Sequence, residues 1–193
     1  AVLMAATFLA MPAVAKTPSA ARSLGVAWLE NHQNADGSWG SGPTTPLATA
    51  EALGALAAAG RAHSTVALGA KAWLLNREFQ SLDYWARSIR ALSACGIDMR
   101  VDAQALALLG EGRRGWGLTS GGAENSYDSA LAVAAIEAAG EVMPDAGNKL
   151  DEILHFRIRP DFGFGQDGVP LSNPEASDRT LTAEIVRALS QDC

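Results

Sequence analysis

The chain has 193 residues, a net charge of −6 and 48% hydrophobic residues, which excludes an intrinsically disordered protein. No block of basic residues is present, so nucleic acid and anionic membrane surfaces are not expected as partners. Alanine is abundant and β-branched residues are sparse, which favours an all-α fold. The length suits one domain with a sizeable core, or a piece of a larger protein.

The first fifteen residues, "AVLMAATFLAMPAVA", are apolar and uncharged, and they end in Ala13-Val14-Ala15 before Lys16. This pattern is typical of a secretory signal segment and its cleavage site, and the segment is too short to span a bilayer comfortably. The alternative is an apolar first helix of the domain. We predict a signal-peptide-like segment at 1–15, a secreted or periplasmic protein, no stable membrane span after signal removal, and a repeat domain over 16–193. Because Cys193 falls within a helical pattern, the sequence leaves a longer chain open.

Four segments read as amphipathic helices that end at or near a small residue: 45–60, 82–96, 126–140 and 179–193. We aligned them on Gly60, Gly96, Gly140 and Cys193. Each then has alanine ten and five residues before the anchor, and an aliphatic residue seven and four before it. This stripe predicts helices that approach closely at their small residues, with glycine as a left-handed C-cap.

A second helix-like run precedes each of these segments, at about 19–33, 65–77, 101–109 and 146–158. The sequence therefore predicts four consecutive helical hairpins. The turn inside the first hairpin, "ADGSWG", is echoed by "RRGWGLTSGG" (113–122) and "PDFGFGQDG" (160–168), whereas the second hairpin has only "FQSLDYW". Asp-Gly favours a turn, and the glycines let the backbone pass close to a neighbour. The aromatic residue is then placed to cover the end of the next helix.

The stretch "WLENHQNADGSWG" (28–40) resembles the QW-type repeat of squalene cyclases and protein prenyltransferases. The resemblance implies an α/α toroid, in which inner helices line a central cavity and outer helices wrap them. It also implies that the motif residues tie neighbouring hairpins together. Complete toroids of this superfamily have more hairpins, so four would form an open arc. The motif residues here are Trp28, Gln33, Asp36, Gly37, Trp39 and Gly40.

The same resemblance implies where catalysis would occur, at a cluster of aspartates that opens an inner helix. Of that cluster only Asp128 stands in "NSYDSA", and only Asp178 in "DRTLTA". A single aspartate at a helix start is more typical of a capping or first-turn residue, so Asp128 is a weak catalytic candidate.

Related transferases hold zinc with Asp, Cys and His, but the histidines here are isolated, so we expect no metal and no cofactor. Cys95 and Cys193 end inner helices two hairpins apart, which makes a disulfide between them an unfavoured pairing.

One polar face lies off the aliphatic stripe, at positions nine and six before each anchor, and is expected to face the cavity. Glu51 could pair with Arg87 or Arg90 on the next inner helix. One interpretation is ion pairing between helices on a wetted wall. The other is a polar site for an anionic or sugar-like ligand, beside aromatic side chains. The candidate ligand-binding residues are Trp85, Arg87, Arg90, Trp116, Tyr127, Asp128, Asp178 and Glu184.

These features predict an exported, non-catalytic domain that binds an unknown ligand or protein segment at the cavity mouth. The alternative is an enzyme of the same fold. It would be a divergent polyprenyl cyclase or transferase using Asp128, or a polysaccharide lyase using Arg87 or Arg90.

Overall fold

The computed structural model describes residues 17–79, 81–113, 115–122, 124–142, 182–183 and 185–186. These residues are all-α, as predicted: they contain six α-helices, a short 3-10 turn at Gly42–Thr44, and no β-strand. None of the helices in these ranges is long and apolar enough to cross a membrane. The helices are α1 (Pro18–Asn31), α2 (Thr45–Ala58), α3 (Thr65–Leu75), α4 (Leu82–Ala94), α5 (Arg100–Leu109) and α6 (Ser126–Ala138).

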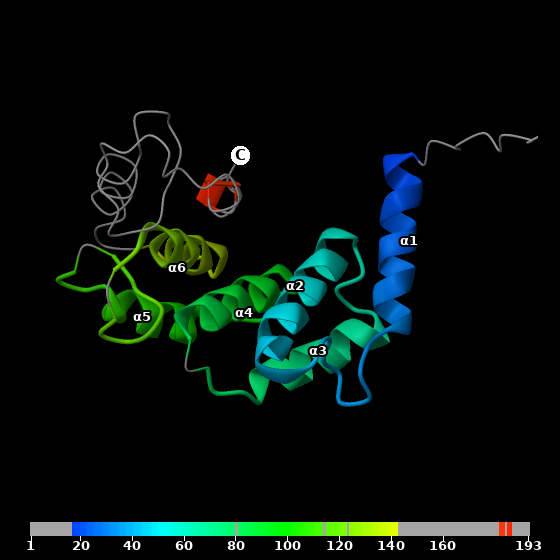
Figure 1. The fold of residues 1–193 in the computed structure, drawn as a ribbon, viewed down its shortest axis with the longest axis horizontal. Coiled ribbons are helices and arrows are strands. Elements are labelled where there is room, and N and C mark those ends of the chain that lie inside the picture. Colours follow the sequence, from blue (N-terminus) through cyan, green and yellow to red (C-terminus); the bar gives the residue numbers. More distant parts are fainter. Residues whose placement is uncertain are drawn as a thin grey trace, which may run out of the picture.

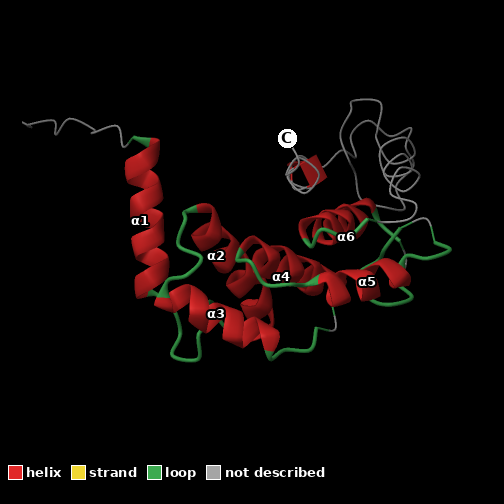
Figure 2. Cartoon of the chain, turned by 180° about the vertical axis from the view of Figure 1, so that it is seen from behind, coloured by secondary structure: helices red, strands yellow, loops and turns green. Residues whose placement is uncertain are grey.

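The helices form two layers (Figure 1). The second helices of the first three predicted hairpins, α2, α4 and α6, pack side by side, with α4 in the middle, and are called the inner helices and the inner layer below. Helix α3 packs mainly on α2, and α5 packs on α6 and α4, so α3 and α5 form the other layer (Figure 2). Of the fourth hairpin, residues 182–183 and 185–186 are helical, and its remaining residues lie outside the described chain.

The three predicted C-cap glycines end α2, α4 and α6 in the same way. Gly60, Gly96 and Gly140 have φ values of +74°, +78° and +74°, a region that glycine enters without steric cost. The amide after each glycine then donates to the carbonyl of the aliphatic residue four positions before the glycine, which is the bond of a Schellman motif. The three bonds are Arg61 to Leu56 at 2.8 Å, Ile97 to Leu92 at 3.1 Å and Glu141 to Ile136 at 3.1 Å.

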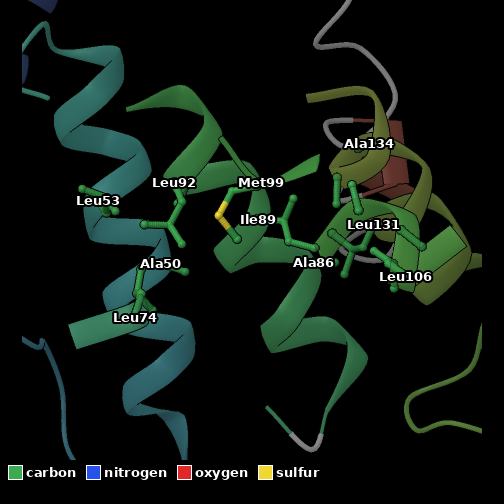
Figure 3. Packing of buried hydrophobic residues seen from close by; sticks show 14 of the residues in the cluster. Ala50, Leu53, Leu74, Ala86, Ile89, Leu92, Met99, Leu106, Leu131 and Ala134 are labelled. Atoms are coloured by element: carbon green, nitrogen blue, oxygen red, sulfur yellow. The ribbon is translucent and has the colours of Figure 1, made fainter. Parts of the chain in front are cut away.

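The predicted small-residue stripe lies at the contacts between the inner helices. Its alanines ten residues before each glycine, Ala50, Ala86 and Ala130, are all buried. Figure 3 shows Leu92 of α4 directed towards α2, with the aliphatic side chains of neighbouring helices packed around it. Because alanine adds so little bulk, neighbouring inner helices can pack closely at these positions. Of the alanines five residues before each glycine, Ala91 and Ala135 are buried, but Ala55 is exposed.

Helix α1 differs from the outer helix that the sequence predicts. It has no buried residue, and Figure 1 shows it at an angle to the two layers. The ring of Trp28 is 57% exposed and stacks on His32, one turn further along the same helix, at 4.4 Å. The corresponding Trp73 of α3 is buried, and its indole N–H donates to Asp36 in the loop of the preceding hairpin at 3.0 Å. In the described chain Trp28 therefore makes no comparable tie between hairpins.

Candidate functional site

A hollow of about 600 Å³ opens on the inner layer. All of its lining residues come from α2, α4 and α6, and none comes from α3 or α5. Most of them are alanines, so more than half of the exposed lining is apolar, and the charged residues are few. The charged lining residues are Glu51, Arg87, Arg90 and Glu137.

The hollow coincides with the polar face that the sequence alignment singles out. At the positions nine and six before the glycine, Glu51 and Gly54 of α2 line it, as do Arg87 and Arg90 of α4, and Ala134 of α6. Leu131 of α6, nine residues before Gly140, is buried and does not line the hollow. The inner helices therefore present the same face to the hollow in register, and the expectation that this face borders a cavity agrees with the structure.

Arg87 connects the three inner helices. Its side chain is only 7% exposed. Its Nε donates to Asp83 Oδ1 at 2.5 Å within α4, while its two terminal nitrogens contact the carboxylate of Glu51 on α2 and the hydroxyl of Tyr127 on α6. Burial alone lowers the pKa of the Arg87 guanidinium, but the hydrogen bond and charge of Asp83, together with Tyr127 and Glu51, outweigh it, so this pKa lies above its ordinary value.

The Arg87 guanidinium is thus already committed to protein groups. Asp83 and Glu51 supply two negative charges against its one positive charge, and a bound anion would have to displace at least one of them. Arg90 and Glu137 have interaction partners as well. This arrangement fits the first interpretation above, ion pairing between helices, better than a site for an anionic ligand.

Two of the aromatic candidates lie away from the hollow. Trp85 is half-buried and points to α5, where its indole N–H donates to Asp102 Oδ1 at 3.0 Å. Trp116 is fully buried, and its indole N–H donates to the Leu106 carbonyl at 2.8 Å. Neither ring lines the hollow, in contrast to the expectation that both lie near its mouth. Tyr127, the third aromatic candidate, contacts Arg87, which lines the hollow.

Asp128 is a buried first-turn residue of α6. Asn125 is the N-cap: its side-chain oxygen accepts from the Asp128 amide at 2.7 Å, and its side-chain N–H donates to the Asp128 carboxylate. Asp128 does not line the hollow. These contacts are those of the capping alternative that the sequence leaves open. Asp178 and Glu184 lie outside the described residues.

The loop of the QW-like motif is fastened to α3. Gln33 Nε2 donates to the Val66 carbonyl at 2.7 Å and to the Gly37 carbonyl at 2.9 Å. Gly37 has φ +92°, and a Cβ there would come within 2.6 Å of the Gly69 carbonyl oxygen. Glycine is required at this position because the loop and α3 pass so closely.

Asp36 and Gly40 complete the same loop. Asp36 accepts hydrogen bonds from the hydroxyl and amide of Ser38 and from the indole of Trp73, which lower the pKa of its carboxyl below the ordinary 3.8. The Gly40 carbonyl accepts from the Asn34 side chain at 2.9 Å. The polar groups named here, on Gln33, Asp36 and Gly40, are therefore hydrogen-bonded to other groups of the protein.

The tryptophans of the first and third hairpins are held by equivalent partners that the sequence pattern did not single out. The Trp39 amide donates to Thr49 Oγ1 at 3.1 Å and its indole to the Leu29 carbonyl at 3.0 Å. The Trp116 amide donates to Ser129 Oγ at 2.9 Å. Thr49 and Ser129 both stand eleven residues before the C-cap glycine, and a small hydroxyl residue at that position was the available signal.

The described residues include no group of three or more His, Cys, Asp or Glu side chains that could hold a metal ion. Cys95 is a buried free thiol whose pKa is raised by burial, against the opposing charge of Lys71, and Cys193 lies outside the described residues. Comparison with known proteins adds no relative: no family model, no curated protein and no solved structure matches the chain.

Proposed function

We propose that this chain is a non-catalytic binding domain that holds a ligand or protein segment in the hollow formed by α2, α4 and α6. The observation that carries this proposal is the composition of the hollow: its walls are mostly alanine, and its most buried charged side chain, Arg87, is fully engaged by Asp83, Glu51 and Tyr127. Such a site offers shape and apolar surface rather than a reactive group.

An apolar or amphipathic segment, such as a helix, is the occupant that these walls suit best. The volume of about 600 Å³ lies within the usual range for binding pockets, roughly 300–1,000 Å³. Alanine walls allow the axis of an added helix to approach to about 8–10 Å.

We further propose that the domain is an arc of the α/α-toroid type, related to squalene cyclases and protein prenyltransferases. Three consecutive helical hairpins with their second helices in one layer support this arrangement. The equivalent hydrogen bonds of Trp39 and Trp116 support an internal repeat. Within this proposal an enzyme is less favoured, because Asp128 is engaged in the α6 cap and does not line the hollow.

The binding proposal can be tested by blocking the hollow with one bulky side chain. Ala94→Trp places an indole on its wall, and Ala72→Trp makes the same change on an exposed position of α3, which does not line the hollow. We would measure the melting temperature with amphipathic helical peptides and with amphiphilic small molecules. A ligand of the hollow should raise it in the natural chain and in Ala72→Trp but not in Ala94→Trp.

The opposite results are equally informative. If no probe raises the melting temperature, or if both variants respond alike, the hollow is not the binding site. Turnover of a polyene or an acidic polysaccharide by the purified protein would support the enzyme alternative instead.

Export is part of the proposal and rests on the apolar segment at 1–15. N-terminal sequencing of the protein from host culture fractions should find a chain that begins at Lys16 outside the cytoplasm. A cytoplasmic protein that retains 1–15 would contradict export.

A further inference from the structure

The loop of the first hairpin fills the space between three successive helices. The Trp39 indole donates to the Leu29 carbonyl of α1, and its amide donates to Thr49 of α2. From the same loop, Gln33 donates to the Val66 carbonyl of α3. These contacts leave Trp39 only 3% exposed. The space enclosed by these three helices is therefore shaped to hold an indole ring.

The second hairpin has the same three positions but no such loop. Its helices α3 and α4 are joined only by residues 76–81, which contain no Gly-x-Trp sequence. The equivalent residues follow from their spacing in the sequence. Leu74 corresponds to Leu29, because each follows the tryptophan of its outer helix. Trp85 corresponds to Thr49, eleven residues before the C-cap glycine, and Asp102 corresponds to Val66, six residues after it.

All three equivalent residues line one cavity, of about 330 Å³, between α3, α4 and the start of α5. Its walls are mainly apolar, and Figure 3 shows three of the side chains that line it, Leu74, Leu92 and Met99. Ser88, Arg77, Glu78 and Asp102 add polar atoms. Other lining residues are Leu75, Phe79 and Trp85. The space that Trp39 fills in the first hairpin is thus partly empty in the second.

The carbonyl that would receive an indole is arranged alike in both hairpins. Leu29 accepts from the amide of His32 at 3.2 Å and also from the Trp39 indole. Leu74 accepts from the amide of Arg77, again three residues further on and at 3.2 Å. The Asn76 amide is also directed to the Leu74 carbonyl, which has no counterpart at Leu29. Because a carbonyl oxygen has two lone pairs, an indole donor would take the place of the Asn76 amide beside the Arg77 bond.

We propose that this cavity, the α3–α4–α5 pocket, is a docking site for a peptide segment of a partner protein that inserts an aromatic side chain, with tryptophan preferred. The inserted ring packs on Leu74, Leu92 and Met99, and its N–H points to the Leu74 carbonyl. Glu78 and Asp102 outnumber the single cation Arg77 among the charged residues of the pocket, so neutral or basic residues are favoured beside the aromatic one. This site is separate from the hollow of the inner layer and does not depend on its occupant.

The chain's own loop supplies the probe. A synthetic peptide of residues 31–41, "NHQNADGSWGS", contains the Gln and Trp that fill the equivalent space in the first hairpin. Its matched control carries Trp39→Ala. Binding to the full chain would be followed by fluorescence anisotropy of the labelled peptides and by the indole N–H resonance of Trp85. The tryptophan peptide should bind and shift this resonance, and the alanine peptide should bind at least about tenfold more weakly.

Two protein variants make the site assignment falsifiable. Leu75→Gln changes an exposed wall residue of the pocket, and Leu68→Gln makes the same change elsewhere on α3, where leucine is exposed to a similar degree, 55% against 52%. Leu75→Gln should weaken the binding of the tryptophan peptide to the protein, whereas Leu68→Gln should leave it unchanged. The proposal is overturned if neither peptide binds, if both bind equally, if the two variants respond alike, or if the shifts gather on α1 rather than at Trp85.

Discussion

Replacing Trp39 by alanine should lower the free energy of unfolding by about 3–5 kcal/mol. The ring is 3% exposed and packs among the buried residues of the core. Its removal leaves a cavity beneath the loop and also removes the hydrogen bond to the Leu29 carbonyl, which by itself contributes about 1 kcal/mol. This loss is a large part of the roughly 5–15 kcal/mol that stabilises a typical domain.

Trp28 provides an internal control of the same residue type in the same hairpin. Its ring is 57% exposed and stacks on His32 in the neighbouring turn of α1. Trp28→Ala should therefore change the free energy of unfolding by no more than about 0.5 kcal/mol. An intermediate variant, Trp39→Phe, keeps most of the apolar ring but loses the indole donor, and should cost roughly 1–2 kcal/mol.

Urea unfolding followed by far-ultraviolet circular dichroism is the suitable assay, because tryptophan fluorescence changes with the substitutions themselves. The midpoint should fall in Trp39→Ala without a change in the slope, which reports the surface exposed on unfolding. For a chain of this size the melting temperature should fall by something on the order of 6–20 °C. If Trp39→Ala and Trp28→Ala lie within about 0.5 kcal/mol of each other, the loop does not pack as described.

Three further outcomes are expected. Arg87→Met should lower the free energy of unfolding, measured in urea, by about 3 kcal/mol, because the carboxylate and hydroxyl partners of a buried cation are left behind. Glu51→Gln should lower it by under about 1 kcal/mol, because Glu51 is 40% exposed. Equal losses in the two variants would refute the central role of Arg87. Ala130→Leu should destabilise the protein by about 1–3 kcal/mol through overpacking between α6 and α4, whereas the same change at exposed Ala138 should not. An unchanged melting temperature in Ala130→Leu would refute close helix contact at this position. The folded-state pKa of Asp36 lies below 3.8, so its contribution to stability is present above that pH and is lost as pH falls through the folded-state value. Asp36→Asn should therefore lower the melting temperature at neutral pH, and below about pH 4 the melting temperature of this variant should fall less steeply than that of the natural chain. Identical pH profiles for the two proteins would contradict this.

The repeat pattern allowed much of the fold to be predicted. Hydrophobic spacing and C-cap glycines placed α2, α4 and α6 almost to the residue, because helix periodicity and a left-handed cap are local properties of the chain. The same alignment placed Glu51, Arg87 and Arg90 on one face, since equivalent positions of stacked repeats face the same way. The same regularity predicted the burial of Ala50, Ala86 and Ala130, whereas Ala55, which belongs to the same stripe, is exposed at the hollow.

The contents of the site could not be predicted so well. Trp85 is two residues from Arg87 and Trp116 lies in the loop before Tyr127, yet both indoles donate to residues of α5. Asp128 begins α6 as an acid would in a catalytic cluster, yet it is engaged by Asn125. Sequence spacing gives the position along a helix, but the direction of a long side chain depends on which neighbouring groups can accept its hydrogen bonds.

The sequence by itself determined the helical class, the hairpin repeat, the close contacts at alanine and the face that borders the hollow. These depend on the 3.6-residue period and on the conformational freedom of glycine, which act within a few residues. Only the tertiary structure decided that Arg87 is shared among three helices, that Trp39 is buried while Trp28 is exposed, and that the second hairpin leaves a pocket where the first holds an indole. Those outcomes depend on which segments, distant in sequence, come within a few ångströms of one another, and that is fixed only when the layers pack.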